Sequence, residues 1–162
     1  MKIITLHQPY ASLIAKGFKK YETRSWSTNY RGKLAIHSAK RLPDFETVMR
    51  LRDVFPSISR AFSSTTANYT KAESDLMPLG SIVAIADLIG CELMFSTMIS
   101  EQSQLELAVG NWAVGSYAWL LENVIALPTP IPYKGSQGLT NIDPEHLAEL
   151  EAIAACSGEP NR

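Results

Sequence analysis

The sequence predicts an α+β fold, a small mixed β-barrel with peripheral α-helices. Its 162 residues are an ordinary length for one domain around one hydrophobic core. Short β-prone runs are scattered along the chain, and the strongest, 81–88, is apolar enough to be buried on both faces. The helical patterns are too few and the strands too scattered for a doubly wound sheet, and no internal repeat is present. A small barrel therefore fits better.

The first part of the fold is expected to alternate short strands with a short helix. Pro9 suits the first turn of that helix, and Gly17 is the residue type expected just past its end. A turn at 29–32 separates two further strands. In chain order the expected elements are a strand at 2–6, a helix at 10–16, a strand at 20–25 and a strand at 33–38.

The second part begins with an amphipathic helix and an irregular segment. The apolar residues of 43–54 recur at helical spacing, whereas 56–78 is rich in Ser and Thr and is typical of a loop or lid. Three prolines after 127 indicate extended backbone or a sheet edge. The elements expected after this segment are a strand at 81–88 continuing toward Met94, a helix at 102–109, a strand at 117–127 and a helix at 143–155.

The expected domain organisation is one domain over 1–162. Residues 42–78 form a helix-plus-loop insert, and 143–162 form a C-terminal helix and tail. Cys91 and Cys156 have no metal-ligand spacing with the histidines, which indicates a reducing compartment and two inert thiols. No apolar run reaches the length of a membrane span, so we expect a cytoplasmic protein without membrane association, metal or cofactor. The sequence leaves the oligomeric state open.

Positive charge is concentrated at the start of the chain. Residues 1–41 contain nine Lys or Arg and one acid, Glu22, although the formal net charge of the whole chain is −1. Such an asymmetry attracts phosphate groups if the cations also cluster in space. Solvated surface lysines are the alternative explanation.

The densest group of reactive side chains is Gly17-Phe-Lys19-Lys-Tyr-Glu22-Thr-Arg24. In an extended strand the period of two sends Glu22 and Arg24 to one face and Thr23 to the other. A bend after Gly17 brings Lys19 toward the face that carries Glu22 and Arg24. We therefore expect the functional site at this segment.

The motif and its surroundings resemble the ASCH (activating signal cointegrator homology) domain. The chain matches all four positions of the family signature Gly-x-Lys-x-x-Glu-x-Arg, at Gly17, Lys19, Glu22 and Arg24. The family-like segments are Thr5-Leu-His-Gln-Pro-Tyr-Ala-Ser-Leu-Ile, Arg31-Gly32, Ala35-Ile-His37, Tyr117-Ala-Trp119 and Pro130-Ile-Pro-Tyr-Lys134-Gly135-Ser-Gln-Gly138. The resemblance is strongest to the version of the domain in a transcriptional coactivator.

This resemblance implies a PUA-like barrel with a basic cleft that binds RNA, single-stranded nucleic acid or a nucleotide-sized ligand. Lys19 and Arg24 would hold phosphate, and Glu22 would orient them or read a base edge. Tyr10 and Trp26 offer flat faces for stacking of unpaired bases. The residues expected at the nucleic-acid interface are Tyr10, Lys19, Glu22, Arg24, Ser25, Trp26, His37 and Lys40.

Two other functions stay open. Some short family members are amidohydrolases that remove the acetyl group of N4-acetylcytidine with a Lys, a Thr nucleophile and a distant Glu. Here Glu22 stands at the Thr position, so Lys19 and Glu22 would be catalytic only if water replaces that nucleophile. A ribonuclease would need a base such as His7 or His37 in the cleft. The remaining alternative is a protein-partner module that uses the 56–78 loop or an apolar edge.

Overall fold

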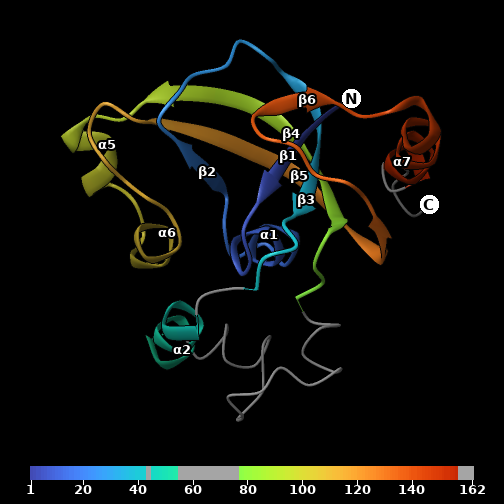
Figure 1. Ribbon diagram of the computed structural model, residues 1–162. Helices are drawn as coiled ribbons and strands as arrows, with labels where there is room; N and C mark the ends of the chain where they lie inside the picture. The colour runs from blue at the N-terminus through green and yellow to red at the C-terminus, as the bar shows by residue number, and fades with distance from the viewer. Residues whose placement is uncertain (43–44, 55–76, 157–162) are drawn as a thin grey trace, which may run out of the picture.

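The protein is built on one curled, six-stranded mixed sheet with helices at its edges and inside its curl (Figure 1). The computed structural model describes residues 1–42, 45–54 and 77–156. The strands are β1 (Lys2–Leu6), β2 (Tyr21–Arg24), β3 (Gly32–Ser38), β4 (Ser81–Leu93), β5 (Tyr117–Pro132) and β6 (Leu139–Asn141). The helices are α1 (Tyr10–Ala15), α2 (Phe45–Val54), α5 (Ser96–Ser100), α6 (Gln104–Val109) and α7 (Pro144–Cys156).

The strand order is β2-β5-β4-β3-β1-β6. β1 and β3 are parallel, and every other neighbouring pair is antiparallel. The long antiparallel pair of β4 and β5 shifts register three times along its length. Such bulges increase local twist and bend a strand, which accounts for the curl of the sheet. The short β2, which carries the end of the sequence motif, lies at one edge and pairs with β5.

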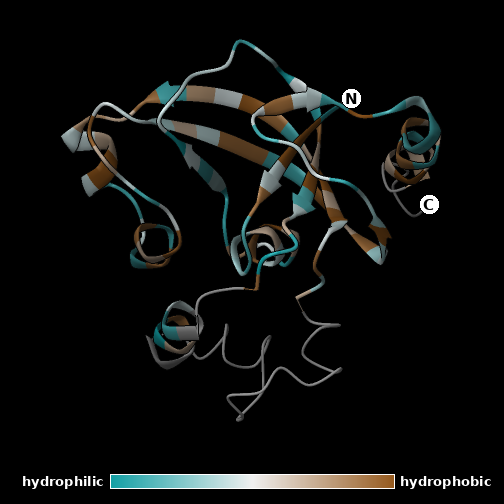
Figure 2. Ribbon diagram, viewed as in Figure 1, coloured by the Kyte–Doolittle hydropathy of each residue, from teal (hydrophilic) through white to brown (hydrophobic). Residues whose placement is uncertain are grey.

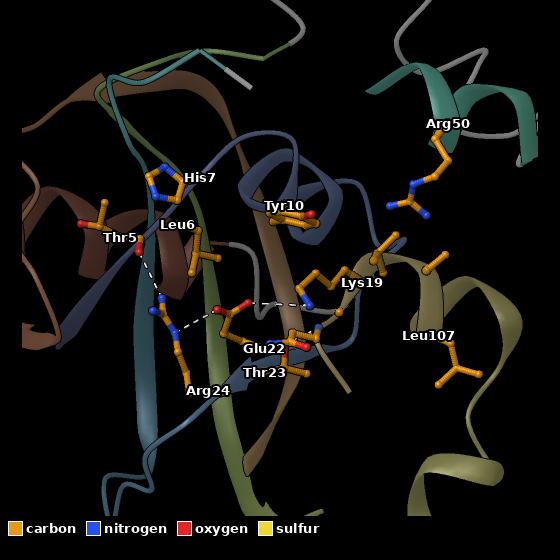
Figure 3. A pocket seen from close by; sticks show the side chains of 14 residues that line it. Thr5, Leu6, His7, Tyr10, Lys19, Glu22, Thr23, Arg24, Arg50 and Leu107 are labelled. Atoms are coloured by element: carbon orange, nitrogen blue, oxygen red, sulfur yellow. Dashed lines mark hydrogen bonds and ion pairs between the residues drawn. The ribbon is translucent and has the colours of Figure 1, made fainter. Parts of the chain in front are cut away.

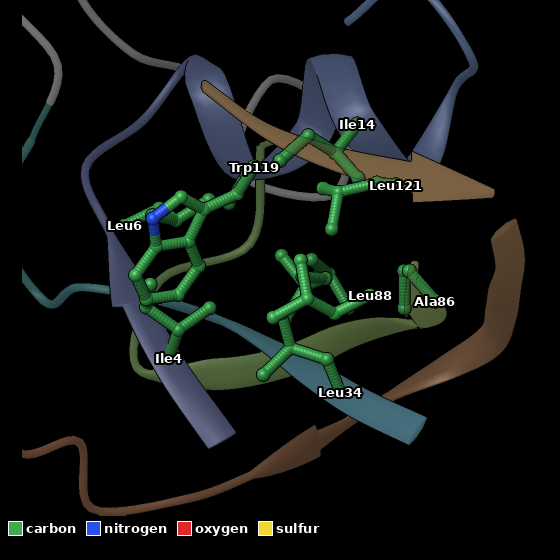
Figure 4. Close-up of a cluster of buried hydrophobic side chains, with 12 residues drawn as sticks. Ile4, Leu6, Ile14, Leu34, Ala86, Leu88, Trp119 and Leu121 are labelled. Carbon is green, nitrogen blue, oxygen red and sulfur yellow. The ribbon is translucent and has the colours of Figure 1, made fainter. Parts of the chain in front are cut away.

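The concave face of the sheet holds the main hydrophobic core. Hydrophobic residues recur along β4 and β5 (Figure 2), and α1 packs into the curl against β1, β3, β4 and β5. Trp119 of β5 is fully buried there, edge-on to the Trp26 ring at 4.7 Å between centroids. A second cluster between the opposite face and α7 includes Ile85 and Leu150. The buried side chains of the main core include Ile4, Leu6, Ile14, Leu34, Ala86, Leu88, Trp119 and Leu121 (Figure 4).

A glycine-dependent turn connects α1 to β2. Gly17 has φ +76°, a left-handed conformation that L side chains rarely adopt. Its N–H bonds the carbonyl of Ile14, and the N–H of Phe18 bonds that of Leu13, both at 2.9 Å. This pair of bonds is the Schellman arrangement that ends many helices. Because the chain reverses here, Lys19 enters the interior immediately before β2 begins.

The predicted fold class is confirmed, as are most of the elements. The 81–88 strand runs on to Leu93, and the strand from Tyr117 continues through the prolines to Pro132. β2 pairs only with the first four residues of β5, so within the described residues the rest of that side of β5 has no neighbouring strand. A proline there loses no hydrogen bond of the sheet. The sequence reasoning missed α5 and β6, which have five and three residues.

Part of the proposed insert, including most of the 56–78 loop, lies outside the described residues. Within the described ranges, no helix is both long enough and apolar enough to cross a membrane.

Candidate functional site

A pocket of about 450 Å³ opens beside β2, between the start of α1 and the segment that contains α6. Its walls come from parts of the chain that are far apart in sequence (Figure 3). The lining residues are Thr5, Leu6, His7, Tyr10, Lys19, Glu22, Thr23, Arg24, Arg50, Leu107, Ala108, Val109, Gly110 and Asn111. Three of the four signature positions, all except Gly17, therefore border one hollow.

Three charged side chains form a row at the pocket, with a carboxylate between two cations. Oε1 of Glu22 is 3.0 Å from Nε of Arg24, and Oε2 of Glu22 is 3.7 Å from Nζ of Lys19. Arg24 also donates from Nη2 to the carbonyl of Thr5 at 3.1 Å, which ties the row to β1 (Figure 3). The bend after Gly17 thus brings Lys19 to the face of Glu22 and Arg24, as the sequence suggested.

Lys19 is buried, with only 2% of its surface exposed. Among the described residues its Nζ has no hydrogen-bond partner, because the carboxylate of Glu22 lies beyond ordinary hydrogen-bond distance. Burial lowers the pKa of the Lys19 ammonium, while the negative charges of Glu22 and Glu106 act in the opposite direction. The charge of Lys19 is thus balanced from within the protein and is largely shielded from water.

Glu106 of α6 is the second carboxylate beside Lys19, and the sequence reasoning did not single it out. One of its oxygens accepts the backbone N–H of Lys20, whereas Oε2 is buried without a hydrogen-bond partner in the described part of the chain. Burial raises the pKa of the Glu106 carboxyl, opposed by the N–H of Lys20 and the charge of Lys19. Glu106 therefore fastens α6 to the chain just before β2, across 86 positions of sequence.

A small apolar cluster holds the helices around the pocket. Leu13 of α1, Leu51 of α2 and Val109 of α6 are buried against one another, together with Met77. Leu51 follows directly after Arg50, so this packing sets the exposed Arg50 at the pocket. Figure 3 shows the guanidinium of Arg50 directed from α2 toward the pocket, on the side away from Arg24.

Thr23 points to the segment after α6. Its Oγ1 accepts the N–H of Asn111 at 2.9 Å, and Tyr21 on the same face packs edge-on against Trp112. The alternation along β2 is therefore the expected one. Thr23 still borders the pocket, because the segment that it contacts is one of the pocket walls.

The residues predicted from sequence divide into two groups. Tyr10, Lys19, Glu22 and Arg24 line the pocket, and so does His7, whose position the sequence could not fix. The exposed Ser25 and Lys40, the half-buried Trp26 and the buried His37 are not among its lining residues.

Trp26 and His37 have structural surroundings instead. The carbonyl of Trp26 accepts the indole N–H of Trp119 at 3.3 Å. His37 lies 3.1 Å from both the Thr5 hydroxyl and the Tyr133 carbonyl, and burial lowers the pKa of its imidazole. Trp26 is thus packed against the core residue Trp119, and His37 ties β3 to β1 and to the segment after β5.

A group of potential metal ligands lies at the start of α7, outside the pocket. It consists of Asp143, Glu145 and His146. Oδ1 of Asp143 accepts the backbone N–H of His146 at 3.0 Å and contacts its Nδ1 at 2.8 Å. These contacts lower the pKa of the Asp143 carboxyl to about 2, and they are those of a helix N-cap. Capping thus explains the contact between Asp143 and His146.

Comparison with known proteins gives the family. The ASCH domain profile matches residues 4–131, most of the chain. The chain belongs to the ASCH domain family. Activating signal cointegrator 1 from Mus musculus is 25% identical over 141 residues and that from Homo sapiens 25% over 142, with 86% of this chain covered in each. The chain spans 22% of the length of these curated relatives.

Solved ASCH structures share the fold. The crystal structure of ASCH from Zymomonas mobilis has a TM-score of 0.55 at 16% identity, over 93% of each chain. A tyrosine-to-phenylalanine mutant of the Zymomonas mobilis protein has a TM-score of 0.54 at 16% identity, over 93% of this chain and 96% of that one. This ASCH chain therefore has the PUA-like fold that the signature implied.

Proposed function

We propose that this ASCH domain binds single-stranded RNA through the pocket beside β2. The observation that carries the proposal is the shared pocket of Tyr10, Glu22 and Arg24, with Arg50 at its border. An aromatic ring beside cationic side chains is the combination that single-stranded nucleic acids bind. The hollow is within the usual size range of small-ligand pockets and suits an unpaired nucleotide better than a duplex.

The burial and charge of the pocket residues favour a different phosphate-binding group from the pair expected from the sequence motif, Lys19 and Arg24. Lys19 is buried between Glu22 and Glu106, so its charge is a weak source of attraction for phosphate. Arg24 is partly exposed, and its guanidinium has N–H groups beyond the one donated to Thr5 and the buried Nε, which is ion-paired with Glu22. The exposed Arg50 is therefore the phosphate-binding group of the proposal, and Arg24 supplies further donors to the bound nucleotide. Lys19 contributes mainly by holding the carboxylates of Glu22 and Glu106 in place.

The test is fluorescence anisotropy with a labelled, mixed-sequence single-stranded RNA over a range of salt concentrations. Affinity should fall steadily with salt, because the binding of phosphates releases counterions. Arg24→Gln and Arg50→Ala should each weaken binding and reduce the salt slope by about 0.7 for each phosphate that the variant no longer neutralises. Urea unfolding of each variant separates weaker binding from impaired folding.

Arg31→Ala is the matched control for these variants. Arg31 is exposed and donates to the carbonyls of Thr28 and Tyr30, within its own turn and outside the pocket. It should keep the wild-type affinity. Salt-independent binding, or an equal loss in all three arginine variants, would contradict the proposal.

A hydrolase acting on RNA or a modified nucleoside is the second candidate. The observation that favours it is the buried Lys19, whose lowered pKa increases the share of neutral amine beside the pocket. Wild type, Lys19→Met and Glu22→Gln are incubated with N4-acetylcytidine and with mixed RNA, and products are resolved by chromatography. Activity in wild type that both variants lose supports hydrolysis, whereas equal product from all three indicates a contaminant.

A further inference from the structure

The row of charged groups at the pocket presents a specific hydrogen-bonding pattern. Lys19 and Arg24 only donate, and the carboxylate of Glu22 between them only accepts. The two contacts, of 3.7 Å and 3.0 Å, place one cation on each oxygen of Glu22. From one side to the other, the row therefore reads donor, acceptor, donor (Figure 3).

The Watson–Crick edges of the four RNA bases differ in how they match this row. Uracil presents acceptor, donor, acceptor, because two carbonyl oxygens flank one N–H. Guanine matches at two positions and turns an amino group toward a cation at the third. Cytosine and adenine each present a ring nitrogen acceptor at the centre, where the carboxylate would repel it. Uracil is thus the base whose whole edge complements the row.

The residues around the row of Lys19, Glu22 and Arg24 suit a flat ring that carries a phosphate. Leu6, Tyr10 and Leu107 supply apolar or aromatic surface around it. Arg50 is exposed and lies across the pocket from Arg24, and its guanidinium is directed toward the pocket (Figure 3). Guanidinium binds phosphate oxygens in a fork geometry. Nζ of Lys19 is buried without a hydrogen-bond partner among residues 1–42, 45–54 and 77–156, so it retains donor capacity for a ligand.

We propose that the pocket selects one unpaired uridine nucleotide, with the uracil edge on Lys19, Glu22 and Arg24 and a phosphate on Arg50. This inference rests on the proposed RNA binding and adds a base preference and a phosphate site to it. Arg50 comes from α2, so the proposed phosphate site lies outside the signature segment.

The test is isothermal titration calorimetry of the full chain with UMP, CMP, AMP, GMP and uridine. UMP should bind at least about tenfold more tightly than the other nucleotides, which is the discrimination expected of well-placed polar contacts. Glu22→Gln should reduce that preference, because an amide offers both a donor and an acceptor. Arg50→Ala should weaken UMP and leave uridine unchanged, whereas Arg31→Ala should change neither.

Two results would overturn the uridine assignment. The first is CMP, AMP or GMP binding as tightly as UMP, and the second is an unchanged preference in a folded Glu22→Gln protein. An equal loss for UMP and uridine in Arg50→Ala would overturn the phosphate site. Homopolymers separate this inference from RNA binding itself. If U10 and C10 bind equally and both weaken with salt, the base preference is wrong and RNA binding stands. If no oligomer binds, RNA binding is wrong.

Discussion

Lys19→Met is expected to lower the free energy of unfolding by about 3 kcal/mol at pH 7, the lower end of the range for breaking a buried ion pair. Lys19 is only 2% exposed, and its removal leaves the carboxylates of Glu22 and Glu106 without their shared cation. Glu22 would still be ion-paired with Arg24, and Glu106 would still accept the backbone N–H of Lys20, which limits the loss of unfolding free energy. Urea unfolding followed by circular dichroism measures it.

The loss should shrink as the pH falls. The pKa of Glu106 is raised above its ordinary value of 4.5, so the folded protein takes up this proton at a higher pH than the unfolded chain. Between those two values, lowering the pH therefore favours the folded state. Removal of the Lys19 charge should raise the pKa of the Glu106 carboxyl further, because that charge lowers it in the wild type. The difference in unfolding free energy between Lys19→Met and wild type should therefore be smaller at pH 5 than at pH 7.

Two further variants make this prediction specific. Lys20→Met changes an exposed neighbour and should alter stability by no more than about 0.5 kcal/mol. Adding Glu106→Gln to Lys19→Met should recover part of the loss, because it removes one of the unpaired carboxylates. A pH-independent loss with no recovery would show that the cost arises from side-chain packing and not from charge.

Trp119→Ala is expected to lower the free energy of unfolding by about 3–5 kcal/mol, the usual cost of deleting a large buried aromatic side chain. Trp119 is 0% exposed and packs in the main core with Trp26. Trp119 also lies opposite Glu22 in the pairing of β5 with β2, so its position helps to set the position of the strand that carries the site. Urea unfolding again measures the change.

Trp119→Phe should lose much less, because it keeps a ring in the core and gives up the indole bond to the Trp26 carbonyl. Trp112→Ala is the surface comparison, since that ring is half-buried and packs on Tyr21. If the three variants were equally destabilised, the core role of Trp119 would be wrong.

The strands were predictable where local patterns were strong. The apolar run at 81–88 and the β-prone start at Lys2 identified β4 and β1, and Pro9 and Gly17 marked the ends of α1. The missed elements are short pieces whose structure depends on contacts. β6 exists because Leu139–Asn141 pairs with β1, a long-range partnership that no local pattern contains.

The site was predictable only in the part that lies within one stretch of chain. Lys19, Glu22 and Arg24 stand close in sequence, so a strand period and a bend were enough to group them. Arg50 and Glu106 join them through the packing of α1, α2 and α6 around Leu13. The one local signal for Glu106 is an acid among the apolar residues Leu105, Leu107, Ala108 and Val109 of a short helix.

The bond from Glu106 to the backbone of Lys20 also bears on how the signature should be used to recognise other proteins. The octapeptide at 17–24 is half of a two-part unit, and the other half is an acid on a helix that comes much later in the chain. A peptide or a graft that carries the octapeptide alone would lack the carboxylate that keeps its lysine in place. A search for proteins with this site should therefore require both the octapeptide and an acid at the position of Glu106.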